Sequence, residues 1–255
     1  MTDFLLIHGA GHGSWVWDEV HGILEDAIRP NSRLRNSMYS PGRILSPDLH
    51  GHGARFSIDN PLESTFERCI TELDDLIERE RVQNLVIGVH SLSGLIGLEL
   101  IRRLKTPPLG LVLVGAVIPD LFHNVLEMLP ISTRIILNAL RLQPGTPPKS
   151  VKLHREFGLK LLCHGMRYPE ASSQILRRLN PIPLQPWEAL PNPLALEPKC
   201  PITYQLLLKD KFLPVHTQRK MVDTLSNVDV ENLDSGHEAP ITNPREVAHA
   251  LLKYS

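Results

Sequence analysis

The amino-acid sequence predicts an α/β fold, with a mostly parallel sheet of about six strands that is flanked by helices and carries a helical cap. Three observations predict this fold class. Short apolar runs recur along the chain, helical patterns lie between them, and one long stretch without a strand pattern interrupts the alternation. Because the runs are apolar on both faces, we expect parallel strands that are covered by helices on each side.

Six runs are expected to form strands because each is short and apolar and is bounded by turn or helix signals. Three helical patterns accompany them, the first with apolar residues at helical spacing and acidic residues opposite. The predicted strands cover residues 4–9, 43–48, 84–90, 110–118, 202–208 and 228–234, and the predicted helices cover residues 63–82, 94–104 and 244–254.

Residues 120–200 depart from this alternation of strands and helices. They contain four helical patterns and a proline-rich return, without a strand signal, between two predicted strands. We therefore expect a helical cap over the carboxyl edge of the sheet, where open α/β folds bind ligands. The core would then comprise residues 1–119 and 201–255. The helical patterns of the cap cover residues 121–129, 133–142, 150–162 and 169–179, and the return covers residues 180–201.

Composition excludes several classes of protein. The 255 residues carry 27 basic and 28 acidic side chains, which are scattered along the chain, so we expect no nucleic-acid partner. The N-terminus has only four consecutive apolar residues, and no segment approaches the roughly 20 needed to span a bilayer, so we expect neither a signal peptide nor a membrane partner. Cys69, Cys163 and Cys200 lack C-x-x-C spacing, which favours reduced thiols in a cytoplasmic protein.

The motif "VHSLSG" contains the strongest candidate for a nucleophile, Ser91. It nearly matches the G-x-S-x-G turn, but Val89 and Ser93 occupy two glycine positions. A tight turn from a strand into a helix exposes the seryl oxygen and directs the helix N-terminus at any charge formed there. We expect Gly88 and Gly94 to make room for Val89. A helix N-cap serine is the ordinary alternative, so the assignment depends on the partners of Ser91.

Those partners are Asp210 and His237. A serine hydroxyl needs a base, and the base needs an orienting acid. Asp210 follows the fifth predicted strand and His237 follows the sixth, so both should lie with Ser91 at the same edge of a parallel sheet. The chain order of serine, acid and histidine is the one expected for this fold. Asp120, after the fourth strand, is the rival orienting acid.

The glycine-rich turn "HGAGHG" after the first strand supplies a candidate oxyanion hole. The amide of Ala10 would act there with the amide of Leu92, which directly follows Ser91. Neither a Walker lysine nor G-x-G-x-x-G spacing is present, so we expect no cofactor. The imidazoles of His8, His12, His50 and His52 suggest zinc, but no carboxylate or cysteine stands at ligand spacing and glycine turns explain both stretches, so we expect no metal.

Five blocks together resemble the α/β-hydrolase superfamily, and within it the small plant-type esterases and hydroxynitrile lyases and their bacterial relatives. They are "FLLIHGAGHGSWVWDEV", "ILSPDLHGHG", "HSLSG", "LKDKFLPVHTQRKMVDTL" and "DSGHEAPITNPREVAHAL". The resemblance covers nearly the whole chain outside the cap. It implies an α/β-hydrolase fold that lacks the first two strands of larger relatives.

The resemblance also bears on the reaction. The lyases of this group carry a lysine directly after the catalytic histidine and a threonine in the oxyanion turn, whereas this chain has Glu238 and Ala10. We therefore predict a carboxylesterase that acts on a small-molecule ester of small to medium size, with Ser91, His237 and Asp210 as its triad. A lyase or C–C bond hydrolase with the same triad, and a receptor-like binding protein, remain alternatives. The sequence does not decide between a monomer and a homodimer.

Overall fold

A computed structural model describes residues 2–28, 42–57, 60–142, 149–166 and 169–255. Its main sheet has six strands in the order β2-β1-β3-β4-β7-β8, and every neighbouring pair is parallel. The predicted fold class is confirmed. The strands are β1 (Asp3–Ile7), β2 (Ile44–Leu45), β3 (Leu85–His90), β4 (Gly110–Val114), β7 (Ile202–Leu207) and β8 (Val228–Leu233).

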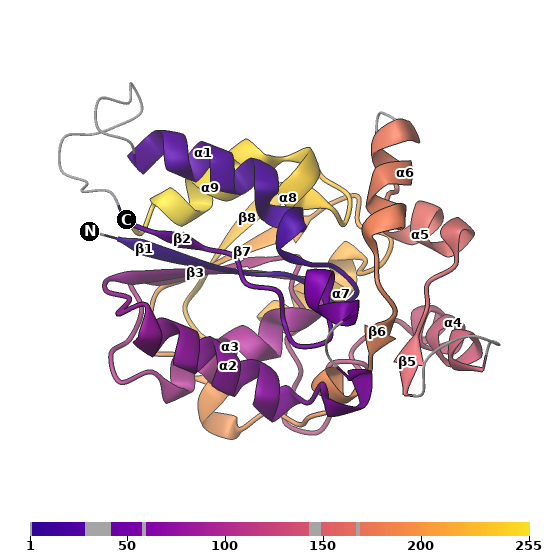
Figure 1. The fold of residues 1–255 in the computed structure, drawn as a ribbon, viewed down its shortest axis with the longest axis horizontal. Helices are drawn as coiled ribbons and strands as arrows, with labels where there is room; N and C mark the ends of the chain where they lie inside the picture. Colours follow the sequence, from indigo (N-terminus) through magenta and orange to yellow (C-terminus); the bar gives the residue numbers. More distant parts are fainter. Residues whose placement is uncertain (1, 29–41, 58–59, 143–148, 167–168) are drawn as a thin grey trace.

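Helices cover both faces of the sheet (Figure 1). One face carries α1 (Asp18–Ile28), α8 (Ala239–Thr242) and α9 (Pro244–Leu252). The opposite face carries α2 (Phe66–Arg79) and α3 (Gly94–Arg103), while α7 (Val215–Val222) contacts β7. Short 3-10 helices cover residues Ser14–Trp17, Gly53–Ser57, Pro61–Glu63, Ser91–Ser93, Gln185–Trp187 and Pro193–Leu196.

Alternate residues of β1 show why the sheet is buried on both sides. Phe4 and Leu6 belong to the apolar cluster under α1 and α9, whereas Leu5 and Ile7 belong to the cluster under α2 and α3. Successive side chains of a strand point to opposite faces, so an unbroken apolar run suits a strand between two helical layers. The apolar pattern of the sequence thus follows directly from the layered architecture.

The segment between β4 and β7 differs from its prediction. It contains α4 (Ile131–Arg141), α5 (Arg155–Leu161) and α6 (Pro169–Arg178), but also two short strands, β5 (Ser150–Val151) and β6 (Ile182–Pro183), which pair antiparallel. The expectation of a segment without strands is therefore wrong. Val151 is buried and β-branched, which favours an extended conformation over the first turn of the expected helix. Residues 143–148 and 167–168 of this segment lie outside the described residues.

The predicted helix over residues 121–129 is also wrong, because this stretch forms turns. Its polar side chains bond to nearby backbone groups. Asp120 accepts from the amide of Phe122 at 2.9 Å, and Asn124 and Glu127 each accept from the amide of the other, at 3.0 and 2.8 Å. Such local bonds compete with helical ones, and Pro130 follows directly.

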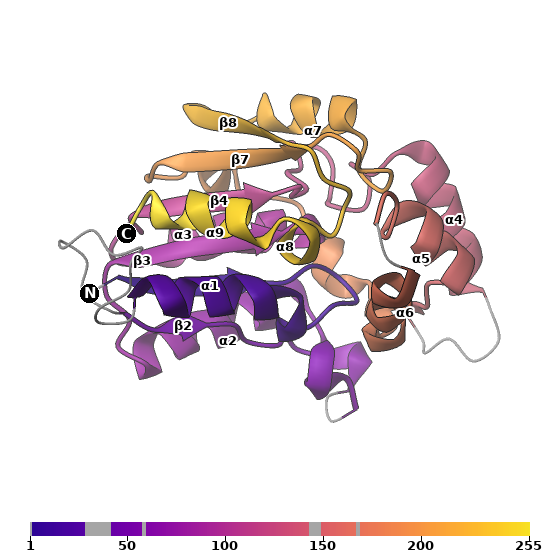
Figure 2. The same cartoon turned by 90° about the horizontal axis from the view of Figure 1, so that it is seen from above.

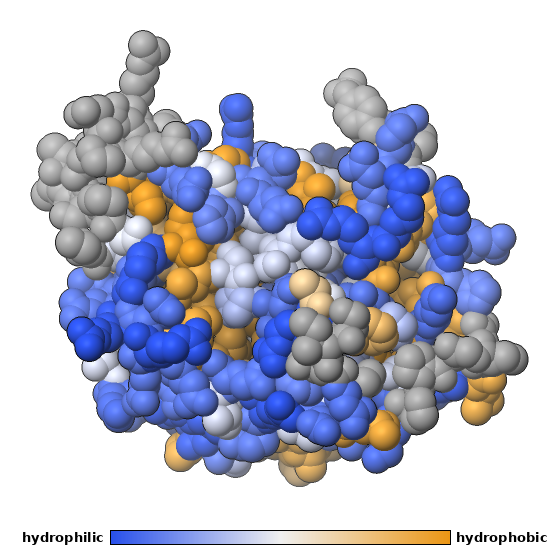
Figure 3. Space-filling model, in the orientation of Figure 1, coloured by the Kyte–Doolittle hydropathy of each residue, from blue (hydrophilic) through white to orange (hydrophobic). Residues whose placement is uncertain are grey.

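The elements α4, α5 and α6 lie together beyond the carboxyl ends of the strands (Figures 1 and 2). This is the edge at which Ser91, Asp210 and His237 are located. The face seen in Figure 3 is largely hydrophilic, with hydrophobic side chains in smaller groups. None of the helices in the described part of the chain has the length and apolarity to cross a bilayer.

Candidate active site

Ser91 lies in a strained turn directly after β3. Its φ is 58°, in the left-handed region that non-glycine residues seldom occupy. The turn after β1 packs closely on it, since a Cβ added to Gly9 would lie 2.7 Å from Cβ of Ser91. Gly9 therefore has no room for a side chain, and this allows the turn after β1 to pack against Ser91.

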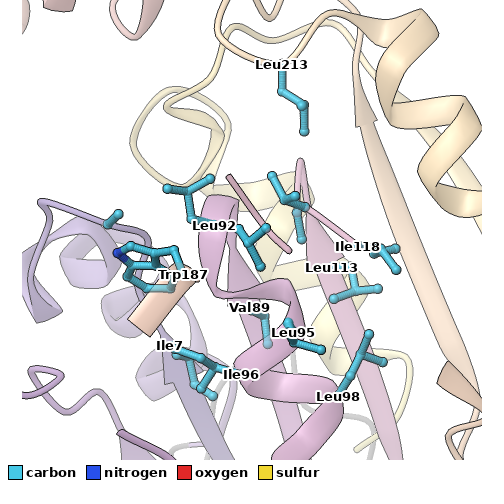
Figure 4. Packing of buried hydrophobic residues seen from close by; sticks show 14 of the residues in the cluster. Ile7, Val89, Leu92, Leu95, Ile96, Leu98, Leu113, Ile118, Trp187 and Leu213 are labelled. Carbon is cyan, nitrogen blue, oxygen red and sulfur yellow. The ribbon is translucent and has the colours of Figure 1, made fainter. Parts of the chain in front are cut away.

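The room for Val89 comes from Gly97, one turn into α3, and the expectation that Gly88 and Gly94 provide it is wrong. A Cβ added to Gly97 would lie 2.6 Å from Cγ2 of Val89. Figure 4 shows Val89 directed from β3 toward the helix that carries Leu95 and Ile96. A Cβ on Gly88 would instead meet Leu6 and Leu251, and one on Gly94 would meet the carbonyl of Val117.

The structure brings the three predicted residues Ser91, His237 and Asp210 into one chain of hydrogen bonds. Oγ of Ser91 lies 2.9 Å from Nε2 of His237, and Nδ1 of His237 lies 2.7 Å from Oδ2 of Asp210. A carboxylate can only accept, so Nδ1 carries the proton and Nε2 is left to accept from the serine hydroxyl. The three residues are 3%, 1% and 4% exposed.

Asp210 is fixed by the backbone that follows it. Its Oδ1 accepts from the amides of Phe212 and Leu213 at 2.8 and 2.9 Å, which leaves Oδ2 for His237. Burial by itself lowers the pKa of His237, but the charge of Asp210 and the hydrogen bond to it, together with the charge of Glu238, raise that pKa above its ordinary value. The imidazole is thus suited to take up a proton.

Asp120, the rival acid, is occupied elsewhere. Its carboxylate bonds to Nδ1 of His123 at 2.8 and 3.0 Å and to the amide of Phe122. The carboxylate that bonds to His237 is that of Asp210 and not that of Asp120.

The amides of Ala10 and Leu92 are free of acceptors among the residues that the structure describes. Oγ of Ser93 donates to the carbonyl of His8 at 2.5 Å, which ties the elbow to the turn containing Ala10. Ser93, in place of the usual glycine, thus connects the two segments that bear the candidate oxyanion amides.

Two of the four histidines considered for zinc, His8 and His52, are buried and hydrogen-bonded to the backbone. Nε2 of His8 accepts from the amide of Leu49 at 3.0 Å, and burial lowers the pKa of His8 well below its ordinary value. Burial also lowers the pKa of His52, to about 4. Within the described residues, no group of three or more His, Cys, Asp or Glu side chains is arranged to hold a metal ion.

Sequence reasoning missed a buried contact between a histidine and a carboxylate beside the candidate triad. Nε2 of His12 lies 3.1 and 3.2 Å from the carboxylate oxygens of Glu238. Next to this pair, Nε2 of His90 donates to the carbonyl of His237 at 2.9 Å. The only sequence signal was an acid directly after the predicted catalytic histidine, and nothing local indicated that residues 226 positions apart would meet.

A parallel sheet with a strained serine elbow, and with an acid and a histidine after two other strands, defines the α/β-hydrolase class. The chain belongs to the alpha/beta hydrolase family, whose model matches residues 4–250. The predicted superfamily is therefore confirmed.

Three relatives illustrate the range of this similarity. A carbendazim hydrolyzing esterase from a Nocardioides species is 25% identical over 130 residues, which cover 51% of this chain and 48% of that protein. The match thus spans about half of that relative's length. Methylesterase 17 from Arabidopsis thaliana is 25% identical over 274 residues, with 98% and 90% covered. The structure of an extracellular alpha/beta-hydrolase from a Paenibacillus species superposes with a TM-score of 0.82 at 19% identity, covering 100% and 99% of the two chains, which shows a shared fold.

Proposed function

We propose that this protein hydrolyses a carboxylic ester of small to medium size through an acyl-enzyme intermediate. The observation that carries the proposal is the hydrogen-bonded chain from Ser91 through His237 to Asp210, with distances of 2.9 and 2.7 Å, at a strained elbow. The names of the Nocardioides and Arabidopsis relatives, both esterases, support the same reaction.

Each residue has a role in this proposal. His237 removes the proton of Ser91 as Oγ attacks the ester carbonyl, and then delivers that proton to the leaving alcohol. Asp210 keeps the imidazole in the required tautomer and stabilises its positive charge. The amides of Ala10 and Leu92 stabilise the oxyanion, and a water molecule, activated by His237, releases the acid.

The segment of residues 120–200 acts in this proposal as a cap over residues 1–119 and 201–255. Ser91 is buried, and Trp187, from the return of the segment, belongs to the same apolar cluster as Leu92 (Figure 4). An apolar cover of this kind excludes water and favours apolar acyl or alcohol groups. A cytoplasmic location and a homodimer stay predictions, and the three cysteines are free thiols, as a reducing compartment would require.

Hydrolysis of p-nitrophenyl esters of increasing acyl length tests the function. Ser91→Ala should reduce kcat/KM by roughly 10⁴-fold or more, because a triad without its nucleophile retains little of its rate enhancement. Ser226→Ala, at an exposed serine, is the matched control and should leave the rate unchanged.

If the folded protein hydrolyses no ester of any chain length, or if Ser91→Ala retains the full rate, the proposed function is wrong. Product analysis with a wider panel of substrates would then distinguish the lyase and C–C hydrolase alternatives. Ligand-induced thermal stabilisation without turnover would favour a receptor-like protein.

A further inference from the structure

The pair of His12 and Glu238 is buried deep beside the candidate triad. The carboxylate of Glu238 accepts from Nε2 of His12 at 3.1 and 3.2 Å, and the side chains of His12 and Glu238 are 2% and 0% exposed. A buried carboxylate is costly unless it is paired and hydrogen-bonded. The burial of this pair is unfavourable for the charged groups, and Glu238 directly follows His237, so we expect a role of the pair in the site.

The hydrogen bonds of His12 fit a charged pair. Its Nε2 faces the carboxylate of Glu238, and its Nδ1 lies 3.0 Å from the carbonyl of Ala10. The carbonyl of Ala10 can only accept, and the carboxylate of Glu238, when ionised, also only accepts. With Glu238 ionised, the imidazole donates from both nitrogens, which requires that it is doubly protonated. The arrangement is therefore satisfied by an imidazolium between two acceptors.

The two bonds of His12 connect the two halves of the site. On one side it holds Ala10, whose amide is a candidate oxyanion donor, and on the other it holds Glu238, which directly follows His237. We propose that His12 and Glu238 form a charged bridge that positions the imidazole of His237 relative to the oxyanion turn. Both are positioning residues, and the inference rests on the proposed ester hydrolysis.

Titratable groups face the bridge from several elements. The ring of His90, at the end of β3, lies 5.7 Å from that of His12 and 5.0 Å from that of His237, between centroids. Cys163, after α5, interacts electrostatically with Glu238, and Asp210, after β7, bonds to His237. Burial lowers the pKa of His90 to about 3 and raises that of Cys163 to about 12, so both are neutral at the pH of the assay.

The sign of the electrostatic effect follows from the charge of Glu238. Burial alone would raise the pKa of this carboxyl, but the charge and hydrogen bond of His12 outweigh it and lower that pKa to about 2. The resulting negative charge helps to raise the pKa of His237. Its removal should lower that pKa, so that His237 remains an unprotonated base at more acidic pH.

Glu238→Gln tests the bridge, because it removes the charge and keeps the shape of the side chain. We expect kcat for p-nitrophenyl acetate to fall roughly tenfold at an unchanged KM, within the 100-fold that misplacement by 1 Å can cost. The acid limb of kcat/KM should also move to lower pH. Glu246→Gln, at an exposed glutamate on α9, is the matched control and should change neither quantity.

The double variant His12→Gln, Glu238→Gln covers the case in which Glu238→Gln does not fold, since two amides can bond without any charge. It should move the acid limb to lower pH by less than Glu238→Gln does, because it removes the positive charge of His12 together with the negative charge of Glu238. Nitrogen-15 NMR of the wild-type protein should show both ring nitrogens of His12 protonated at neutral pH, a result that requires no activity.

The outcomes separate the two hypotheses. If the wild-type protein hydrolyses esters but the folded variants keep its acid limb and its kcat, the bridge proposal is wrong and the proposed function stands. A singly protonated His12 would also contradict the charged bridge. If the wild-type protein hydrolyses no ester, the proposed function fails, whatever the NMR spectrum of His12 shows.

Discussion

The elbow at Ser91 depends on small residues in contact with it. The backbone of Ser91 is in the left-handed region, which costs on the order of 1–3 kcal/mol and persists only where the surroundings enforce it. Gly9 allows the turn after β1 to approach Ser91, and Gly97 accommodates the side chain of Val89. The departure from G-x-S-x-G at Val89 is thus compensated by Gly97, which lies one turn into α3.

This compensation predicts that Gly97→Ala lowers the free energy of unfolding by about 1–3 kcal/mol, the usual cost of overpacking a core. The new methyl group would lie 2.6 Å from Cγ2 of Val89. Gly22→Ala, on α1, is the control, because a Cβ there meets no atom within 4 Å. Urea unfolding of both variants measures the difference.

Val89→Ala should recover most of the stability lost in Gly97→Ala, since it removes the atom that clashes. Equal stability of Gly97→Ala and Gly22→Ala would contradict the explanation of the elbow.

Val89→Gly alone should retain or raise the rate at which the protein hydrolyses p-nitrophenyl esters.

At the scale of elements, the end of α6 and the residues directly after it contact the turn after β1, the following 3-10 helix and the start of α1. The guanidinium of Arg178 lies 4.6 Å from the ring centroid of Trp15, and its Nη1 lies 3.5 Å from a carboxylate oxygen of Asp18. The amide of Asn180 donates to the carbonyl of Gly11 at 2.8 Å. The segment that we propose as a cap therefore contacts the turn that carries Ala10.

Loss of the Arg178 contact should loosen α6. In Arg178→Ala, we expect the amides of α6 to exchange hydrogen roughly two- to fivefold faster, because an exposed cation–π contact contributes about 0.5–1 kcal/mol. Arg177→Ala removes the neighbouring arginine of the same helix and serves as the control. Unchanged exchange in Arg178→Ala would show that this contact does not hold α6 in place.

Only those residues of the candidate site that directly follow a predicted strand could be predicted from the sequence. Ser91, Asp210 and His237 each follow a strand of one parallel sheet, so their meeting could be inferred from strand ends alone. The bridge between His12 and Glu238 depends on the detailed course of two loops, and no local pattern encodes it. The short strands that contain Val151 and Ile182 were not predicted. These residues are extended because they pair with each other, and neither stretch has a strand pattern of its own.

At the scale of the whole molecule, the sheet separates two apolar clusters. The cluster under α2 and α3 continues into the segment above the sheet edge, since it contains Leu137 and Trp187 as well as Leu92 and Leu95. The candidate nucleophile thus lies where the sheet and this segment share one core. This position explains how Ser91 can be buried and strained within a fold stabilised on both sides of the sheet.

Covalent labelling of Ser91 tests the central claim most directly. The wild-type protein is treated with a fluorophosphonate, and the adduct is located by intact-protein and peptide mass spectrometry. We expect one adduct per chain, on the peptide containing Ser91, slowed strongly in His237→Ala and absent in Ser91→Ala. An adduct on another residue, or equal labelling of Ser91→Ala, would contradict the assignment of Ser91 as the nucleophile.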